Sequence, residues 1–536
     1  MSSTTANSRI AARTVVKGLQ GVTGLTGAVR AGAPGVYSMR GFTENGIAIQ
    51  YDGIRVGAST VYTRPYSSFN MERIEVLRGP ASAIHGDGAV GGVINYVRRK
   101  PTSGPVRVEA LASAGSFANY GLGVAASGSI NTSTSFVVSA HGSDGKSFVD
   151  RNSIDSLHLV GGLQFDLGGG TRLLVEGDYW RASTDNAYWG TPLVGGQLEE
   201  RLRKVNYNVA PDNQYRDSVS WGRAALDWKL GSSWSAKTQM YYYRADRAWK
   251  NFPEPRANAG TNPLTVSIRE VEALSYDNSQ PGFRQAFNTA GKLASFGYRF
   301  AIGGELNQSD FESPRFQAGP TNITVDAFQP GERSFNAFVG NPDRLRAAKV
   351  TTAALFTEAS LDLTSTVRAF AGYRFDDLRV RTRFENPTGG LQTAARDYTA
   401  NNVRFGVTYA FHPTSTVYAA YATGKEPVDN SAFAFISPAD LRNTKLTRAR
   451  QFQVGSKHQF ASGRAELTTA LYDIKRNDVL TVDPNLGGGT RFQIGEQKSY
   501  GFEIAGAVRP TNYLSFSATS RSSMPNTVTT FRRQPD

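Results

Sequence analysis

Long segments with an apolar residue at every second position constrain this chain more than any other feature. In residues 403–411 the apolar side chains are Val403, Phe405, Val407, Tyr409 and Phe411, and the intervening positions are polar or small. Residues 451–460 and 501–508 repeat the pattern. A period of two is typical of β-strands with one apolar and one polar face. About 17 such segments lie between residues 106 and 519, so an all-β fold is expected.

The connections between these segments are of two lengths. Short turns occupy residues 167–170, 412–414 and 461–463, and long loops occupy residues 182–217, 247–266, 314–346 and 425–446. Short turns at one end and long loops at the other are typical of an antiparallel outer-membrane barrel. A soluble propeller or sandwich is the alternative, but the segments exceed the usual strand length of about 5–6 residues. No repeat of about 40–50 residues is visible either.

Composition excludes several other classes of protein. No run of about 18 apolar residues occurs, so no helical membrane span is expected. The absence of Cys excludes a disulfide scaffold and thiolate catalysis. The five His lack metal-ligand spacing, and neither a GxSxG motif nor a phosphate loop is present. The net charge of +14 comes from Arg spread along the chain. We therefore expect no enzyme activity, catalytic residue, metal site, cofactor or nucleic-acid partner.

The first 101 residues lack this alternation and are predicted to form a mixed α/β module. Three of its motifs occur in order: SMRGF (38–42), YDGIR (51–55) and FNMERIEVLRGPASAIHGDGAVGGVINYVRRKP (69–101). Together they resemble the plug domain of TonB-dependent outer-membrane receptors, in the ferric-siderophore branch. Later segments, VYAAYATG (417–424), LYDI (471–474) and GEQKSYGFE (495–503), are similar to barrel strands of that branch.

The resemblance implies an all-β transmembrane β-barrel of the 22-stranded type with a small α/β N-terminal plug domain inside the lumen; about 17 strands are present here. It implies a receptor of the Gram-negative cell outer membrane that binds a ferric siderophore and imports it into the periplasm. Its partners would be outer-membrane lipid and TonB, with ExbB/ExbD as the energy supply. A receptor for cobalamin, haem or a carbohydrate remains an alternative, as does a non-functional truncated product. A passive porin is less favoured, because it would lack the plug motifs.

Two groups of plug residues are expected to act in gating and in turns. Charged side chains on a plug can pair with polar groups of the lumen, which predicts ion pairing and gating for Arg40, Glu72, Glu75 and Arg78. Turns that need glycine or proline are predicted at Gly79, Pro80, Gly86, Gly88, Gly91 and Gly92. The simpler alternative is that all these residues only define the plug fold.

Siderophore contacts are expected at the plug apex and in the long loops. Arg donates bidentate hydrogen bonds to anionic chelates, and aromatic rings stack on flat groups. The apical candidates are Tyr62, Arg64 and Tyr66, and the weaker loop candidates are Tyr188, Trp189, Trp249 and Phe252. An ordinary solvated loop is the alternative at these positions.

Both ends depart from the family pattern. Neither a signal peptide nor a TonB box is visible, and the last segment, RSSMPNTVTTFRRQPD, lacks alternation. We therefore expect a partial plug in residues 1–103, an incomplete barrel in 104–520, and in 521–536 an aberrant tail that resembles out-of-frame sequence. Because a sheet short of strands would expose backbone polar groups to lipid, we expect a barrel that does not close.

Overall fold

The computed structural model describes most of the 536 residues. The described residues are 4–6, 19, 22, 24–30, 33–43, 47–57, 67–78, 91–318, 323–337, 342–426, 433–434, 436–482, 491–511 and 514–528. Within these ranges, no helix has the length and apolar character needed to cross a membrane.

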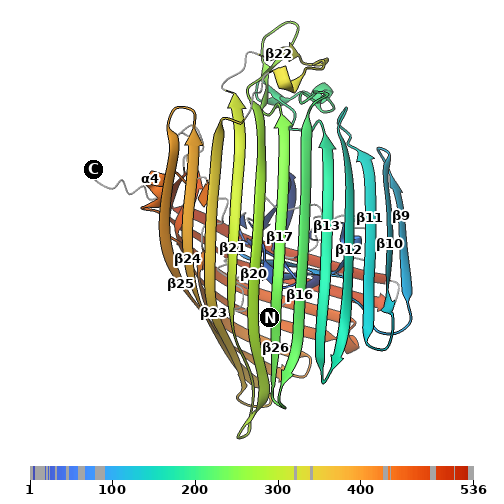
Figure 1. Cartoon of the computed structure of the whole chain (residues 1–536), viewed down its shortest axis with the longest axis vertical. Helices are drawn as coiled ribbons and strands as arrows, with labels where there is room; N and C mark the ends of the chain where they lie inside the picture. Colours follow the sequence, from blue (N-terminus) through green and yellow to red (C-terminus); the bar gives the residue numbers. More distant parts are fainter. Residues whose placement is uncertain are drawn as a thin grey trace.

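Seventeen strands form one closed barrel (Figure 1). In chain order they are β9 (Arg107–Gly115), β10 (Asn119–Ser129), β11 (Thr134–Lys146), β12 (Ser153–Gly168), β13 (Thr171–Asp185), β16 (Gln214–Leu230), β17 (Trp234–Asn251), β20 (Val271–Leu293), β21 (Phe296–Ala318), β23 (Arg344–Asp362), β24 (Val367–Asn386), β25 (Gly390–His412), β26 (Ser415–Glu426), β27 (Thr447–Phe460), β28 (Ala465–Val482), β29 (Arg491–Thr511) and β30 (Leu514–Val528). Each of them pairs with the next in antiparallel register. The expected all-β barrel is confirmed.

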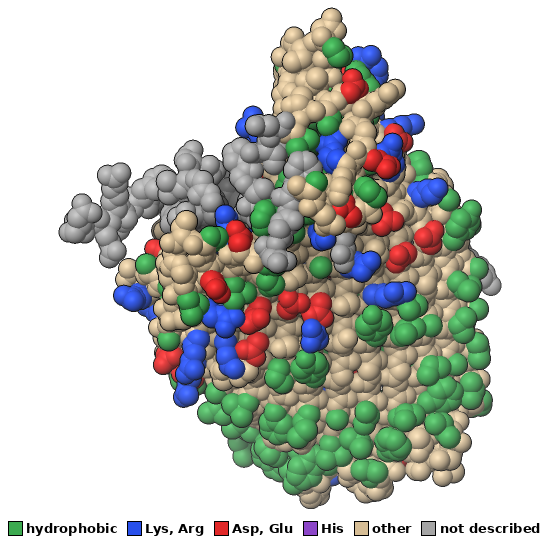
Figure 2. All heavy atoms as spheres, turned by 45° about the horizontal axis from the view of Figure 1, so that its top comes forward, with side chains coloured by type: hydrophobic (Ala, Val, Ile, Leu, Met, Phe, Trp, Pro, Cys, Tyr) green, Lys and Arg blue, Asp and Glu red, His purple; other side chains and the backbone are tan. Residues whose placement is uncertain are grey.

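The alternation in the sequence corresponds to the two faces of the barrel wall. On β25, Phe405 and Phe411 are 54% and 50% exposed on the outside, and Phe452 of β27 is 52% exposed. On β13 the alternate residues Glu176, Asp178 and Trp180 face inward and are buried. Figure 2 shows hydrophobic side chains covering the lower part of the outer surface, with charged side chains gathered toward the loop end. This distribution is that of a membrane barrel with a polar interior.

The expectation that the barrel would stay open is wrong, because β30 lies next to β9 in the strand order and completes the ring. Backbone groups at the two edges therefore need not face lipid. Sixteen antiparallel steps separate β9 from β30, so these two strands run in the same direction, unlike all other neighbours. β30 also extends to Val528, so the boundary expected after residue 520 falls inside a strand.

In the described residues of the plug module, the strands form two small sheets. The larger has the order β1-β7-β8-β5-β6, formed by β1 (Thr4–Ala6), β5 (Ile47–Tyr51), β6 (Ile54–Arg55), β7 (Met71–Arg78) and β8 (Gly92–Arg98). The smaller contains β2 (Leu25–Arg30), β3 (Ala33–Met39) and β4 (Phe42–Thr43). Every residue of β8 is buried, because this central strand is covered on both faces. The sequence also predicts a helix at residues 13–20 and a bend at residues 81–89, but apart from Leu19 these positions lie outside the described residues.

Three long loops pack together into a body at one end of the barrel (Figure 1, top). They contribute the hairpin β14 (Leu193–Val194) and β15 (Gln197–Leu198), and the sheet β18 (Pro255–Asn258), β19 (Thr265–Ile268) and β22 (Ile323–Asp326). The short helices η4 (Glu200–Leu202) and η5 (Phe335–Ala337) lie in the same loops, whose core includes Phe252, Val266, Ile268 and Phe335. A fourth long loop carries α4 (Pro438–Leu441).

Candidate functional site

The first contact between plug and barrel is a buried carboxylate that two plug arginines share. Glu503 lies on the inner face of β29. Arg40 Nε donates to Glu503 Oε1 at 3.0 Å, and Arg40 Nη2 donates to Oε2 at 2.9 Å. Arg78 Nη1 donates to the same Oε2 at 3.1 Å. All three side chains are almost completely buried. Two guanidinium groups are therefore held by one acid, in an arrangement that depends on charge rather than on apolar packing.

Local backbone geometry places Arg40 in this contact. Arg40 and Gly41 have φ values of +53° and +83° and form the tight turn between β3 and β4. The Arg40 carbonyl accepts a hydrogen bond from Ser499 Oγ at 2.6 Å, and the guanidinium lies 4.3 Å from the ring centroid of Tyr472. Gly24 provides the space for the acid, because a Cβ at that position would lie 2.3 Å from Glu503 Oε1.

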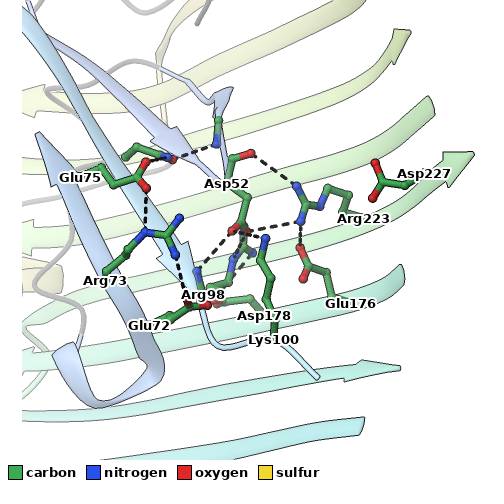
Figure 3. A network of polar contacts seen from close by, with 12 residues as sticks. Asp52, Glu72, Arg73, Glu75, Arg98, Lys100, Glu176, Asp178, Arg223 and Asp227 are labelled. Atoms are coloured by element: carbon green, nitrogen blue, oxygen red, sulfur yellow. Dashed lines mark hydrogen bonds and ion pairs between the residues drawn. The ribbon is translucent and has the colours of Figure 1, made fainter. Parts of the chain in front are cut away.

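The second contact surrounds the turn that joins β5 to β6 (Figure 3). Asp52 and Gly53 both have positive φ, +48° and +82°, as a two-residue hairpin turn requires. The Asp52 carboxylate lies 3.0 Å from Arg98 Nη2 of the plug and 3.8 Å from Arg223 Nη2 of β16. Arg223 also pairs with Glu176 of β13 at 2.6 Å. Plug and wall thus share one charged network.

This network is balanced in charge, and all its members except Lys100, whose side chain is 40% exposed, are buried. Its acids are Asp52, Glu176 and Asp178, and its cations are Arg98, Lys100 and Arg223. Burial alone would raise the pKa of Asp52, but attraction by Arg98, Arg223 and Lys100 outweighs it and lowers that pKa below its ordinary value. The carboxyl is therefore ionised at neutral pH and attracts the cations of both plug and wall.

Further hydrogen bonds extend the second contact along the wall. Gln280 of β20 donates to the Arg55 carbonyl at 3.0 Å and accepts from the Gly57 amide at 2.9 Å. Arg284 of β20 donates to the Gly53 carbonyl at 3.2 Å. On another part of the wall, plug Asn70 donates to the His158 carbonyl of β12 and accepts from Ser139 of β11, both at 2.7 Å.

These polar contacts hold the plug beside an apolar one, in which the Tyr51 ring packs against Trp221 and Tyr243 of the wall with ring centroids 5.8 and 6.0 Å apart. Hydrogen bonds and ion pairs can be exchanged for water when the plug moves, whereas an apolar interface would leave hydrophobic surface exposed. Glu503 and the Asp52 cluster lie on well-separated strands of the wall, so the plug is held from two sides. Among the described residues, no group of three His, Asp or Glu side chains is placed to hold a metal ion.

The structure separates the four expected gating residues into two pairs. Arg40 and Arg78 contact the wall through Glu503. Glu72 and Glu75 instead pair with Arg73 of the plug itself, each at 2.7 Å. The ion pairs of Glu72 and Glu75 therefore lie within the plug, where they support its fold.

The expected turn residues fall partly outside the described residues. Gly92 has φ +148°, and a Cβ there would lie 2.2 Å from Met39 Sδ and 2.3 Å from the Leu77 carbonyl oxygen. Gly91 is buried beside it. The other expected turn residues, Gly79, Pro80, Gly86 and Gly88, lie outside the described residues, as do the apical candidates Tyr62, Arg64 and Tyr66.

The four aromatics expected in the loops do not form one surface, and Trp249 lies on strand β17 rather than in a loop. Trp189 and Trp249 meet edge to face with ring centroids 6.3 Å apart. The Tyr188 ring meets Phe148 edge to face at 6.3 Å, and its hydroxyl contacts Thr191. Phe252 is completely buried against Phe335 in the loop core. Tyr188, Trp189 and Trp249 are partly exposed and remain candidates for ligand contact, whereas Phe252 stabilises the loop body.

Comparison with protein families agrees with this two-part architecture. Residues 131–533 match the family described as TonB dependent receptor-like, beta-barrel, and residues 3–93 match the TonB-dependent Receptor Plug Domain. The chain belongs to the TonB-dependent receptor family. This is a family of transport receptors of the outer membrane.

Individual TonB-dependent receptors resemble the chain over most of its length. The Ferripyoverdine receptor of Pseudomonas aeruginosa is 25% identical over an alignment of 464 positions that covers 82% of this chain and 53% of the relative. The Probable TonB-dependent siderophore receptor PiuA of Acinetobacter baumannii is 24% identical, over 87% of this chain and 65% of the relative. The chain thus spans between about half and two thirds of the length of these relatives.

The fold of a solved TonB-dependent receptor matches as well. The structure of the Ferric-Catecholate import receptor Fiu from E. coli superposes with a TM-score of 0.82 at 18% identity. The match covers 98% of this chain and 81% of that receptor.

Several contact residues of this TonB-dependent receptor were missed by sequence reasoning. Glu503 belongs to the polar face of the alternating segment 501–508. An acidic residue on the face expected to point into the lumen could have indicated a partner for the plug arginines. Asp52 lies in the YDGIR motif, which served only to indicate a plug domain and carried no prediction of a contact for this residue. Arg223 and Glu176 had no signal, because the plug residue that they surround is more than 100 residues away in the chain.

Proposed function

We propose that this chain acts in the Gram-negative outer membrane as a TonB-dependent receptor that binds a ferric siderophore and delivers it to the periplasm. TonB, energised through ExbB/ExbD, would displace the plug. Family membership supports the transport role, and the names of the similar proteins, which include ferripyoverdine and siderophore receptors, support the cargo.

The single observation that carries this proposal is the plug held in the lumen by buried charge pairs with the wall. Arg40 and Arg78 meet Glu503 on β29, and the Asp52 turn meets Arg223 on β16. A barrel that served only for passive diffusion would need no separate module fixed inside its lumen. A transporter needs one that is stable at rest and can be released by force.

Binding to outer membranes tests the cargo. Membranes from cells that express the chain would be incubated with radioactive ferric complexes of pyoverdine, catecholate and hydroxamate type, and with cobalamin and haem. We expect saturable binding of at least one ferric siderophore that exceeds binding by control membranes. Saturable binding of only cobalamin or haem, or of none of the ligands, would contradict the proposal.

A further inference from the structure

A small cavity lies between the end of the plug strand β7 and the barrel strands β24–β27. Its volume is about 260 Å³, which is below the roughly 300–1,000 Å³ of pockets that hold drug-sized ligands. The plug contributes Leu77 and Arg78 to its lining, and the wall contributes Arg404, Thr416 and Lys457 among others. The cavity is therefore sized for a small ion with a few water molecules rather than for a siderophore.

Glycine and alanine on the inner faces of β25–β27 create this space. A Cβ at Gly406 would lie 2.6 Å from the Phe370 ring, and a Cβ at Gly455 would lie 2.5 Å from Tyr418 Oη. The two rings therefore lie close against the backbone of their neighbouring strands. Ala420 is paired with Gly406 and fills little of the wall beside them. A hollow is left that longer polar side chains surround.

The charged side chains in the described lining of the cavity are all cationic. They are Arg78, Arg404 and Lys457. The acids near them stand outside the lining: Glu503 is shared by two plug arginines, and Glu358 of β23 attracts Arg404. A concave site with charges of one sign and walls of low dielectric concentrates ions of the opposite sign. The lining therefore favours an anion.

The hydrogen-bonding groups of the cavity agree with its charge. Guanidinium and ammonium groups are donors only, and the planar guanidinium matches the oxygens of an oxyanion. The Arg404 guanidinium lies 4.7 Å from the centroid of the Phe370 ring, which holds it against the wall. The Tyr418 hydroxyl accepts a hydrogen bond from Gln453 Nε2 at 2.7 Å, so its own proton is left for another acceptor. The site thus offers several donors to one small ligand.

The position of the cavity gives a small anion access to it. Thr408, Thr416 and Lys457 lie within a few residues of the short turns after β25 and β27. In an outer-membrane barrel the short turns face the periplasm. Arg404, Tyr418 and Lys457 are each partly exposed, so solvent reaches the lining. A periplasmic anion can therefore enter without crossing the barrel.

We propose that this cavity binds a small oxyanion of the type of inorganic phosphate, held by Arg404 and Lys457 of the wall together with Arg78 of the plug. An anion in this place touches cations of both plug and wall, so it stabilises the plug in its resting position. The site is separate from that of the cargo and requires no siderophore. It requires only that the plug lie in the barrel as described.

Calorimetric titration of the purified full chain with sodium phosphate, at constant ionic strength, tests the site directly. We expect saturable binding to the wild type. Lys457→Gln should weaken the affinity by about tenfold or more, because a charge-assisted contact with the anion is lost. Lys475→Gln is the matched control: it removes the same charge from an ion pair with Glu496 that lies outside the cavity, and it should leave the affinity unchanged.

A second variant separates a bound anion from a general effect of charge. Ala420→Leu fills the cavity and keeps its three cations, so it should abolish phosphate binding. Ala419→Leu is its control, because Ala419 shares the outer face of the wall with Val407 and Val454. A folded, heat-modifiable chain that binds no phosphate would overturn the proposal. So would equal binding by the wild type and the Lys457→Gln and Ala420→Leu variants.

Protease cleavage of the plug tests the effect of the anion on the resting position. In mild denaturant, phosphate should slow cleavage of the wild-type plug relative to chloride at the same ionic strength, and it should lose this effect in Ala420→Leu. Equal cleavage of the wild type in the two salts would show that the anion does not hold the plug.

Discussion

At the scale of single residues, Glu503 is the wall residue that binds two plug arginines at once. It accepts hydrogen bonds from both Arg40 and Arg78, and all three groups are out of contact with water. Removing one member of a buried charge group leaves its partners without compensation, which costs about 3–5 kcal/mol. An exposed ion pair contributes less than about 1 kcal/mol.

Substitution of Glu503 tests this difference. Glu503→Gln keeps the shape of the side chain but removes the charge that two buried arginines need, so we expect the plug to be destabilised by about 3–5 kcal/mol. Denaturant unfolding, monitored by protease cleavage of the plug, measures the loss. Glu72→Gln is the matched control, because the Glu72 side chain is 47% exposed and pairs with Arg73 of the plug itself. Equal losses for the two variants would show that the Glu503 contact does not hold the plug.

At the scale of elements, the sequence predicts strands better than contacts. Alternation identifies β25, β27 and β29 because each has an apolar face toward lipid and a polar or small face toward the lumen. It fails for the second half of β30, where Ser520 and Ser522 replace the apolar residues and Pro525 follows. That part is a strand because its backbone pairs with β29, as in Gly501 opposite Ser523. Such pairing leaves no pattern in the side chains.

The glycine that begins β8 gives a prediction at the same scale. Gly92→Ala would bring a Cβ within 2.2 Å of Met39 Sδ and 2.3 Å of the Leu77 carbonyl oxygen at φ +148°. We expect the plug sheet to lose about 1–3 kcal/mol through this overpacking, measured by amide hydrogen exchange in β7 and β8. Gly53→Ala is the control, since its φ is also positive but the added Cβ would meet nothing within 4 Å. A loss no larger than that of the control would refute the steric explanation.

At the scale of the whole molecule, the sequence does not predict which distant segments of the chain meet in the fold. The barrel and the plug follow from alternation and from ordered motifs. Closure does not, because it depends on how far seventeen strands curve around the plug. The candidate site was predicted only on its plug side, at Arg40 and Arg78. The wall partners Glu503 and Arg223 lie hundreds of residues from each other, and only the closed ring places both against one plug.

The central claim is that the plug rests in the barrel through polar contacts and must move for cargo to pass. Asn70→Cys combined with Ser139→Cys joins plug to wall where the two side chains now meet at 2.7 Å. The chain has no other cysteine, so a disulfide or a short bis-thiol reagent can link only these positions. The most direct measurement is uptake of a bound radioactive ferric siderophore by cells that carry this variant. Uptake should fall to background in the linked state and return on reduction, whereas undiminished uptake by fully linked protein would contradict the claim.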